Sequence, residues 1–276
     1  MLKPSKTILS VAGSDSIGGA GIQADILTGA ALGVHVMTAL TAVTAQNSIG
    51  VLASHPIPPE MLRLQLEAVV ADIIPDAVKI GMLPSPLHAS VVADFISSHG
   101  FSNVVVDPVI SSTSGFSLSS GSTLSIMKER LFPLASLITP NIPEAEKILQ
   151  VCIQSSEQRK AACFRLLESA RCGAVLLKGG HSEGHIISDL LLMADSDPLS
   201  FHEFSHTKIN TLNSHGTGCT LSSAIAAYLA LGHPLPDAVS MAIDYLQGAL
   251  LAARDYTFGR LGGHGPVNHF FNHRYL

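Results

Sequence analysis

The fold is decided by the stretch TILSVAGSDSIGGAGIQADILTGAAL, which spans residues 7–32. Its first part, residues 7–12, is a short and mainly apolar run that predicts a buried strand. Its last part, residues 21–32, predicts a helix, and the turn at residues 13–21 that joins them is rich in glycine. A strand, a glycine-rich turn and a helix in this order are typical of the first unit of an α/β protein.

The same alternation of strand-like and helical patterns continues along the chain. We expect further strands at residues 34–44, 77–82, 103–107, 137–139 and 174–178, and further helices at 60–74, 87–98, 144–149, 217–231 and 237–254. These units predict an α/β fold with a mostly parallel central sheet and helices on both faces. No linker or internal repeat divides the chain, so we expect one domain over residues 1–276. The serine-rich segment 111–125 is expected to be a loop, either simply solvated or acting as a lid over a cleft.

Composition excludes several classes of protein. Hydrophobic residues make up 47% of the chain and charged residues 13%, which is typical of a folded domain and not of a disordered chain. A net charge of -5 argues against a nucleic-acid partner. The sequence has no run of about 18 apolar residues, so we expect no membrane span. We find no signal peptide and no C-x-x-C pair, so we expect a reducing, cytoplasmic location without a zinc site. The cysteines are Cys152, Cys163, Cys172 and Cys219.

The glycine-rich turn at residues 13–21 offers backbone N–H groups to a ligand at a helix N-terminus, where anions are stabilised. Part of it, residues 19–24, matches the dinucleotide pattern G-x-G-x-x-A. That pattern requires an acidic residue about 20 positions further on, and no Asp or Glu occurs between Asp25 and Glu60. We therefore reject a dinucleotide site, and the turn either binds another anion or is a tight turn without a ligand.

A second candidate site is NSHGTGCT at residues 213–220, which leads into an apolar helix. The successive backbone N–H groups of this segment would form an anion-binding nest able to stabilise a phosphoryl group in transit. Cys219 falls in the first helical turn, a position that lowers the pKa of a thiol and favours the thiolate. The alternative for Cys219 is a buried structural cysteine.

Other polar residues lie where predicted elements begin or end. Asn141 and Glu144 are three apart at a helix start, where they either hold the water shell of Mg²⁺ or cap the helix. Asp107 and Lys178 lie at strand ends, where the lysine either reaches a phosphate or is solvated. Gln46 offers a donor and an acceptor to the edge of a heterocycle. The thirteen histidines show no metal-ligand spacing, so we expect most of them to be surface or core residues.

Eight motifs occur in a fixed order between about residues 7 and 271: AGSDSIGGAGIQAD, TAVTAQN, KIGML, VVDPV, LITPNIPEAE, LLKGGH, NSHGTGCTLSSAIAA and GPVNHF. Together they resemble the hydroxymethylpyrimidine/phosphomethylpyrimidine kinases of thiamine biosynthesis, which belong to the ribokinase-like superfamily. The resemblance implies a ribokinase-like three-layer αβα fold, a homodimer, and the use of ATP and Mg²⁺. It also implies two reactions: phosphorylation of 4-amino-5-hydroxymethyl-2-methylpyrimidine, and phosphorylation of its monophosphate to the diphosphate.

The resemblance further implies roles for individual residues. Four of them would form an anion hole with a cysteine in the position of the base: Gly216, Thr217, Gly218 and Cys219. Five would surround the pyrimidine, the first of them at its polar edge: Gln46, Gly13, Asp25, Met82 and Val109. Three would contact ATP: Lys178, Asn141 and Asp107. Two would organise Mg²⁺, the second through water: Glu144 and Asn141.

The chain departs from the family pattern at a few positions. The family lid often reads VMVAKSGDPLL, whereas residues 109–118 read VISSTSGFSL, so Thr113 and Phe116 replace the usual Lys and Asp. The lysine that this lid usually offers to a phosphorylated substrate is therefore absent. Ile17 stands where Ser, Cys or Pro is common, and Asn268 replaces a frequent His.

Two other functions stay open on the sequence alone. A pyridoxal or pyridoxine kinase of the same superfamily would use a pocket of similar size, and the Cys219 thiol would suit an aldehyde. A non-catalytic binding protein of the same fold would keep the sheet and lose the anion hole or the metal-organising pair. Both of these features are intact in the sequence, which argues against the binding protein.

Overall fold

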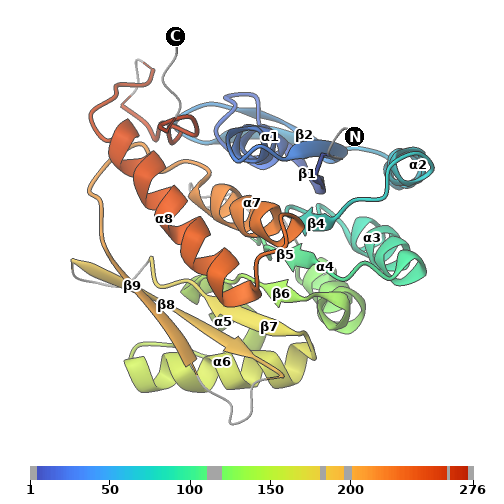
Figure 1. The fold of residues 1–276 in the computed structure, drawn as a ribbon. Helices are drawn as coiled ribbons and strands as arrows, with labels where there is room; N and C mark the ends of the chain where they lie inside the picture. The colour runs from blue at the N-terminus through green and yellow to red at the C-terminus, as the bar shows by residue number, and fades with distance from the viewer. Residues whose placement is uncertain (1–4, 111–119, 181–184, 196–200, 260–261, 273–276) are drawn as a thin grey trace.

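The computed structural model describes residues 5–110, 120–180, 185–195, 201–259 and 262–272 (Figure 1). Within these residues the strands are β1 (Thr7–Ser14), β2 (His35–Gln46), β3 (Val51–Pro56), β4 (Ala77–Ile80), β5 (Val104–Val106), β6 (Leu137–Ile138), β7 (Ala174–Leu177), β8 (Ile186–Met193) and β9 (Phe201–Thr207). The helices are α1 (Gly21–Ala31), α2 (Pro59–Val70), α3 (Pro86–His99), α4 (Gly121–Ile126), α5 (Ile142–Leu149), α6 (Ser156–Ala170), α7 (Thr217–Ala230) and α8 (Leu235–Ala253). A π-helical turn η1 (Met127–Leu131) and a 3-10 turn η2 (Phe132–Leu134) follow α4.

In the part of the chain that the structure describes, the strands form one sheet in the order β3-β2-β1-β4-β5-β6-β7-β8-β9. The strands from β2 to β7 in this order are parallel, with Ile8 opposite Val36 and Val105 opposite Leu137. Strand β3 is antiparallel at one edge, and β8 and β9 are antiparallel at the other. The structure therefore confirms the predicted α/β class and its mostly parallel sheet.

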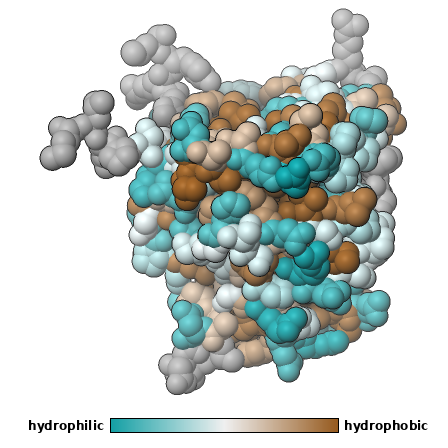
Figure 2. Space-filling view, turned by 90° about the vertical axis from the view of Figure 1, so that its right-hand side faces the viewer, coloured by the Kyte–Doolittle hydropathy of each residue, from teal (hydrophilic) through white to brown (hydrophobic). Residues whose placement is uncertain are grey.

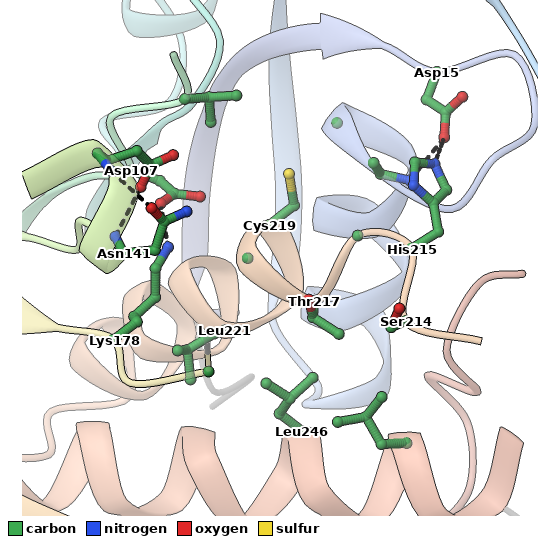
Figure 3. Close-up of a pocket in the computed structure, with 18 of the residues that line it drawn as sticks. Asp15, Asp107, Asn141, Lys178, Ser214, His215, Thr217, Cys219, Leu221 and Leu246 are labelled. Atoms are coloured by element: carbon green, nitrogen blue, oxygen red, sulfur yellow. Dashed lines mark hydrogen bonds and ion pairs between the residues drawn. The ribbon is translucent and has the colours of Figure 1, made fainter. Parts of the chain in front are cut away.

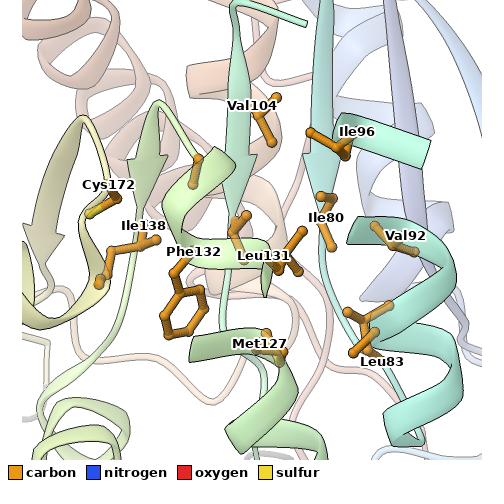
Figure 4. Packing of buried hydrophobic residues seen from close by; sticks show 14 of the residues in the cluster. Ile80, Leu83, Val92, Ile96, Val104, Met127, Leu131, Phe132, Ile138 and Cys172 are labelled. Carbon is orange, nitrogen blue, oxygen red and sulfur yellow. The ribbon is translucent and has the colours of Figure 1, made fainter. Parts of the chain in front are cut away.

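Helices cover both faces of the sheet. Alternate residues of each strand point to opposite sides, so each face has apolar side chains that these helices bury. Leu9 and Ile80 face the core under α2, α3 and α6, and Figure 4 shows Phe132 among the side chains that fill this core. Ile8 and Val105 face the second core, under α1, α7 and α8. Strands that are buried on both sides need apolar residues at every position, which explains the continuous apolar runs seen in the sequence.

The predicted strands and helices are all present and differ from the structure mainly at their ends. Elements β3, α4, α6, β8 and β9 were not predicted. The expectation of a loop over residues 111–125 is wrong for its last part, because residues 121–126 form α4 and the N-cap Ser120 accepts a hydrogen bond from the Thr123 N–H. Residues 111–119, which include the lid positions Thr113 and Phe116, lie outside the described residues.

The carboxyl ends of the parallel strands meet at one edge of the sheet, where α/β proteins bind their ligands. Helices α1 and α5 are the next elements after β1 and β6, and both begin at this edge after a short turn. Among the described residues, none of the helices combines the length and apolar character needed to cross a bilayer. The face seen in Figure 2 mixes hydrophilic and hydrophobic residues.

Candidate active site

A cavity of about 700 Å³ opens at the carboxyl edge of the sheet (Figure 3). Its walls come from residues that follow the parallel strands and from the start of α7. With one exception, the residues predicted for the site line this cavity: Gly13, Gln46, Met82, Asp107, Val109, Asn141, Glu144, Lys178, Gly216, Thr217, Gly218 and Cys219.

The exception is Asp25, which is fully buried and does not line the cavity, contrary to the expectation that it surrounds the substrate with the other four residues. Its side chain is fully buried, and its two carboxylate oxygens lie 3.0 and 2.9 Å from Lys79 Nζ. The hydroxyls of Ser10 and Ser223 also donate to this carboxylate, at 2.5 and 2.6 Å. Asp25 therefore has buried partners on β1, β4 and α7 that hold it away from a ligand.

The glycine-rich turn is closed by the side chain of Asp15. Its Oδ2 accepts the N–H groups of Gly19 and Ala20 at 3.0 and 2.9 Å, and its Oδ1 accepts a third backbone N–H at 3.1 Å. Gly21 has a φ of +56°, and a Cβ there would lie 2.2 Å from Gly13 O, so the turn requires glycine. Because these three N–H groups close the turn itself, the structure favours the alternative of a tight turn over an anion site.

Helix α7 begins with the predicted anion-binding nest. Its N-cap Gly216 has a φ of +80°, and a Cβ there would lie 1.7 Å from Gly19 O, so a side chain cannot fit without moving the turn. Gly218 and Cys219 lie in the first turn, where helical geometry leaves N–H groups without a carbonyl partner four residues earlier. Together with the helix dipole, these N–H groups form a site for negative charge in the cavity wall.

Cys219 lies between two polar groups of the cavity, with Asp107 and Lys178 on one side and His215 on the other (Figure 3). Burial raises the pKa of the Cys219 thiol to about 11, although the ammonium of Lys79 and the Gly21 N–H act in the opposite direction. The expectation of a thiolate at this helix start is therefore wrong, because desolvation outweighs the favourable position. The thiol is protonated at neutral pH.

Alkylation of Cys219 by iodoacetamide is expected to be slow at neutral pH and to accelerate about tenfold for each pH unit between about pH 7 and pH 10, because only the thiolate reacts. The exposed Cys152 serves as a reference site in the same sample. Peptide mass spectrometry at several pH values measures both rates. A Cys219 rate that stops rising below about pH 8 would contradict the raised pKa.

An ion pair occupies the side of the cavity formed by β5 and β7. Lys178 Nζ lies 2.8 Å from Asp107 Oδ1, and the same oxygen accepts the Thr139 hydroxyl at 3.0 Å. Burial alone would lower the pKa of Lys178, but the charges of Asp107 and Glu144 raise it, so the lysine is a cation at neutral pH. A Cβ on Gly218 would lie 3.4 Å from Asp107 Oδ2 and 3.6 Å from Lys178 Nζ, so the start of α7 lies directly against this pair.

Asn141 and Glu144 form the capping box of α5. The Glu144 N–H donates to Asn141 Oδ1 at 2.9 Å and the Asn141 N–H donates to Glu144 Oε2 at 2.8 Å, which confirms the capping alternative. Burial raises the pKa of Glu144 to about 7, opposed by Lys178 and reinforced by Asp107. The described residues contain no cluster of three or more metal-ligating side chains. Both side chains are thus already bonded within the cap, and they fit Mg²⁺ only as holders of its water shell, since Mg²⁺ keeps most of its waters and needs only one or two carboxylates.

Sequence reasoning missed two residues at the opposite side of the cavity. His215 Nε2 lies 2.8 Å from Asp15 Oδ2 and 3.2 Å from the side-chain amide of Gln46 (Figure 3). The sequence predicted no individual role for either residue. The available signal was its place inside NSHGTGCT, next to the glycine that opens α7, and the place of Asp15 inside the glycine-rich turn.

A helix start that offers free N–H groups, placed between a polar edge suited to a heterocycle and a Lys–Asp pair, is an arrangement suited to phosphoryl transfer. On this sheet it defines the class of ribokinase-like small-molecule kinases. Known sequences identify the family within this class. A family profile described as phosphomethylpyrimidine kinase matches residues 15–268, and the chain belongs to this family.

Similar proteins include kinases for two kinds of substrate. The chain is 44% identical over 265 residues to the hydroxymethylpyrimidine/phosphomethylpyrimidine kinase of Bacillus subtilis, covering 95% of this chain and 94% of that protein. It is 46% identical over 268 residues to the thiamine biosynthesis bifunctional protein ThiED of Geobacter sulfurreducens, covering 96% of this chain but 52% of that protein, so it spans about half the length of that relative. The solved structure of the pyridoxal kinase of Staphylococcus aureus in complex with AMP-PCP and pyridoxal has a TM-score of 0.87 and 28% identity, covering 99% of this chain and 96% of that chain.

Proposed function

We propose that this chain transfers the γ-phosphoryl group of ATP to the hydroxymethyl group of 4-amino-5-hydroxymethyl-2-methylpyrimidine, and then to the resulting monophosphate, as a step of thiamine biosynthesis. The observation that carries the proposal is the position of the nest at residues 216–219. It opens into the cavity between the side that holds Gln46 and the side that holds the Asp107–Lys178 pair. Membership of the phosphomethylpyrimidine kinase family supports the choice of substrate.

The acceptor is proposed to bind beside Gln46. The amide of this residue offers both a donor and an acceptor to the polar edge of a pyrimidine. Met82 and Val109 provide apolar surface nearby, and a Cβ at Gly13 would meet Met82 Sδ at 3.1 Å, so a side chain at Gly13 would require Met82 to shift. Asp25, which the sequence had placed with this group, is left out because it is buried beneath the cavity.

ATP is proposed to bind on the side of Lys178. The ammonium of Lys178 would bind phosphate oxygens, with Asp107 and Asn141 beside it in the cavity wall. Glu144, together with Asn141 through water, would hold Mg²⁺. When bound, the metal ion neutralises negative charge on the phosphates. Leu246 lies further along the same cavity and offers apolar surface to the adenine.

The transfer itself depends on positioning and on charge stabilisation more than on a strong base, because its transition state is loose. The N–H groups of Gly218 and Cys219 would bind the equatorial oxygens of the transferred group. The Cys219 thiol is protonated at neutral pH, so it adds no charge that would repel a phosphate monoester, the acceptor of the second reaction. The hydroxyl proton leaves late in such a reaction, so the nest is proposed to provide most of the acceleration.

A pyridoxal or pyridoxine kinase is the second candidate, because the similar structure from Staphylococcus aureus is a pyridoxal kinase in complex with pyridoxal. Its identity of 28% is below the 44% shared with the pyrimidine kinase of Bacillus subtilis. The nest and the Asp107–Lys178 pair are both in place, so these residues give no support to a non-catalytic binding protein.

The proposal is tested by incubating the purified protein with ATP, Mg²⁺ and either the hydroxymethylpyrimidine or pyridoxal, and resolving the products by mass. We expect the pyrimidine monophosphate to form first and the diphosphate to follow. Accumulation of the monophosphate alone would limit the function to the first reaction and point to the Thr113 and Phe116 positions. Phosphorylation of pyridoxal alone would move the function to vitamin B6 salvage, and no product from either compound would support the binding protein.

We also propose that the chain forms a homodimer in the cytoplasm. Strand β3 is an edge strand. The β2–β3 hairpin exposes three large apolar side chains: Val43 (46% exposed), Ile49 (50%) and Leu52 (75%). A group of exposed apolar side chains at a sheet edge is a candidate surface for a partner. All four cysteines are free, which agrees with a reducing compartment. Sedimentation velocity measures the mass in solution, and a purely monomeric species at working concentration would contradict the dimer.

A further inference from the structure

His215 Nε2 has two polar neighbours that a single ring nitrogen cannot serve in the same way. Asp15 Oδ2 lies 2.8 Å away, and the Gln46 amide atom assigned as Nε2 lies 3.2 Å away (Figure 3). An imidazole nitrogen either carries a proton and donates, or carries a lone pair and accepts. Nε2 cannot donate to the carboxylate and also accept from an NH₂ group. Its role toward Asp15 therefore decides which atom of the Gln46 amide can face it.

Asp15 determines that Nε2 of His215 carries a proton. The oxygen of Asp15 that faces the ring also accepts the N–H groups of Gly19 and Ala20. Burial would raise the pKa of Asp15, but the contact with His215 and the backbone donors outweigh burial and hold that pKa below its usual value. An ionised carboxylate can only accept hydrogen bonds. His215 Nε2 therefore carries a proton and donates it to Asp15.

The ring of His215 is also held in place by its surroundings. A Cβ at Gly19 would lie 2.5 Å from His215 Cδ2 and 3.0 Å from the side chain of Pro266, so the turn and the C-terminal segment enclose the ring. The His215 N–H donates to Gly265 O at 3.0 Å, which ties its backbone to the same segment. The imidazole therefore cannot turn away from Gln46 without displacing neighbouring backbone.

A donating Nε2 fixes the direction of the Gln46 amide. Amide oxygen and nitrogen have similar size, and their hydrogen-bond partners decide which is which. The amide atom beside His215 must be the oxygen, which shares the single Nε2 proton with Asp15 in a three-centre hydrogen bond. The NH₂ group then occupies the position 3.4 Å from Thr44 Oγ1. Thr44 Oγ1 donates its own proton to Ser14 O at 2.9 Å, so a lone pair of this oxygen can accept from the NH₂ group. In this orientation the side chains of Asp15, His215, Gln46 and Thr44 all have compatible hydrogen-bond partners.

We propose that His215, held by Asp15, is a positioning residue that fixes the direction of the Gln46 amide and makes the pocket select an aminopyrimidine edge over an oxopyrimidine edge. The proposal rests on the proposed function for its substrate class. An exocyclic NH₂ beside a ring nitrogen presents a donor next to an acceptor, and an oxo group beside a ring N–H presents the reverse. A fixed amide pairs with one of these edges, whereas an amide free to rotate pairs with either.

The kinetic test compares 4-amino-5-hydroxymethyl-2-methylpyrimidine with its 4-oxo analogue in the wild type and in His215→Phe, which keeps an aromatic ring but has no N–H. The wild type should prefer the amino compound in kcat/KM by about tenfold to a hundredfold, because a mispaired edge leaves buried polar groups unsatisfied. In His215→Phe the preference should fall to within about threefold, mainly through a higher KM for the amino compound. His35→Phe, at an exposed position at the start of β2, should keep the full preference.

A loss of activity in His215→Phe that is equal for both compounds would overturn the proposal, because a purely structural role predicts that result. Nitrogen-15 NMR of the free protein tests the first step without turnover. We expect a protonated Nε2 on His215, assigned by the loss of its signals in His215→Phe. A proton on Nδ1 alone would overturn the proposal.

The two proposals fail in different ways. If the wild type phosphorylates neither compound, the proposed function fails, and calorimetry then measures the same preference as a ratio of Kd values. A preference for the amino compound that His215→Phe removes would still support the positioning role. Equal binding of the two compounds by the wild type would overturn it.

Discussion

Gly216→Ala should lower kcat for pyrimidine phosphorylation by about 10²- to 10³-fold, the range found when one donor of an oxyanion hole is removed. A Cβ at this position would lie 1.7 Å from Gly19 O, so the start of α7 must move away from the turn. The N–H groups of Gly218 and Cys219 would move with it. These groups are proposed to bind the phosphoryl group in the transition state, so KM for ATP should change much less than kcat. Steady-state kinetics measure both values.

Gly232→Ala is the matched control for this experiment. Gly232 follows the other end of the same helix with a φ of +94°, and a Cβ there would meet no atom within 4 Å. Alanine at either position has the strain of a left-handed backbone, about 1–2 kcal/mol, but only alanine at 216 has the clash. We expect a lower Tm for both variants and a loss of activity for Gly216→Ala alone. Equal kcat values for the two variants would contradict the proposed role of the nest.

The sequence predicts the centre of the sheet better than its edges, and burial explains why. Strand β5 (Val104–Val106) is apolar at every position because both of its faces are covered. Strand β3 carries exposed residues and ends at Pro56, so it has neither a continuous apolar run nor a clear alternation. Strand β9 has two histidines among partly exposed residues. Such edge strands form by pairing with a neighbour, and that neighbour is not visible in local periodicity.

In the candidate site, too, local sequence patterns predict some residues, whereas others depend on contacts made only in the folded chain. Lys178 and Asp107 were predictable because both follow short apolar strands whose ends meet at one edge of the sheet. The contact between Asp15 and His215 joins residues 200 positions apart, and no spacing rule connects them. The pKa of Cys219 could not be read from its place at a helix start, because burial by the folded chain has the larger effect.

Lys79 is a further residue that local patterns do not explain. It is fully buried in β4, where lysine is rare without a partner, and its partner is Asp25 at 2.9 Å. Burial alone would lower the pKa of Lys79, but the charges of Asp25 and Asp107 raise it above its usual value. The resulting stabilisation is fully present below the ordinary lysine pKa of about 10.4 and is lost as the pH rises through the raised value. At neutral pH the pair is therefore intact.

Lys79→Met should lower the free energy of unfolding by about 3–5 kcal/mol at neutral pH, because it leaves the Asp25 carboxylate buried without a counter-charge. Methionine keeps most of the volume of the lysine stem, so little of this loss should come from packing. Lys6→Met is the control, since the Lys6–Asp76 pair has side chains 45% and 30% exposed and should contribute less than about 1 kcal/mol. Urea unfolding of the three proteins measures the differences.

The double variant Asp25→Asn/Lys79→Met separates charge from packing. The asparagine oxygen can accept from one of the two serine hydroxyls, Ser10 or Ser223, and its NH₂ group can donate to the oxygen of the other, so removing both charges should recover at least about half of the stability lost in Lys79→Met. A double variant as unstable as the single one would show that the ion pair is not the cause. Ser223 lies one turn after Cys219 on α7, so this buried group also holds the helix whose start forms the nest. Lys79→Met should therefore lose kinase activity below its own unfolding temperature, and the double variant should lose less.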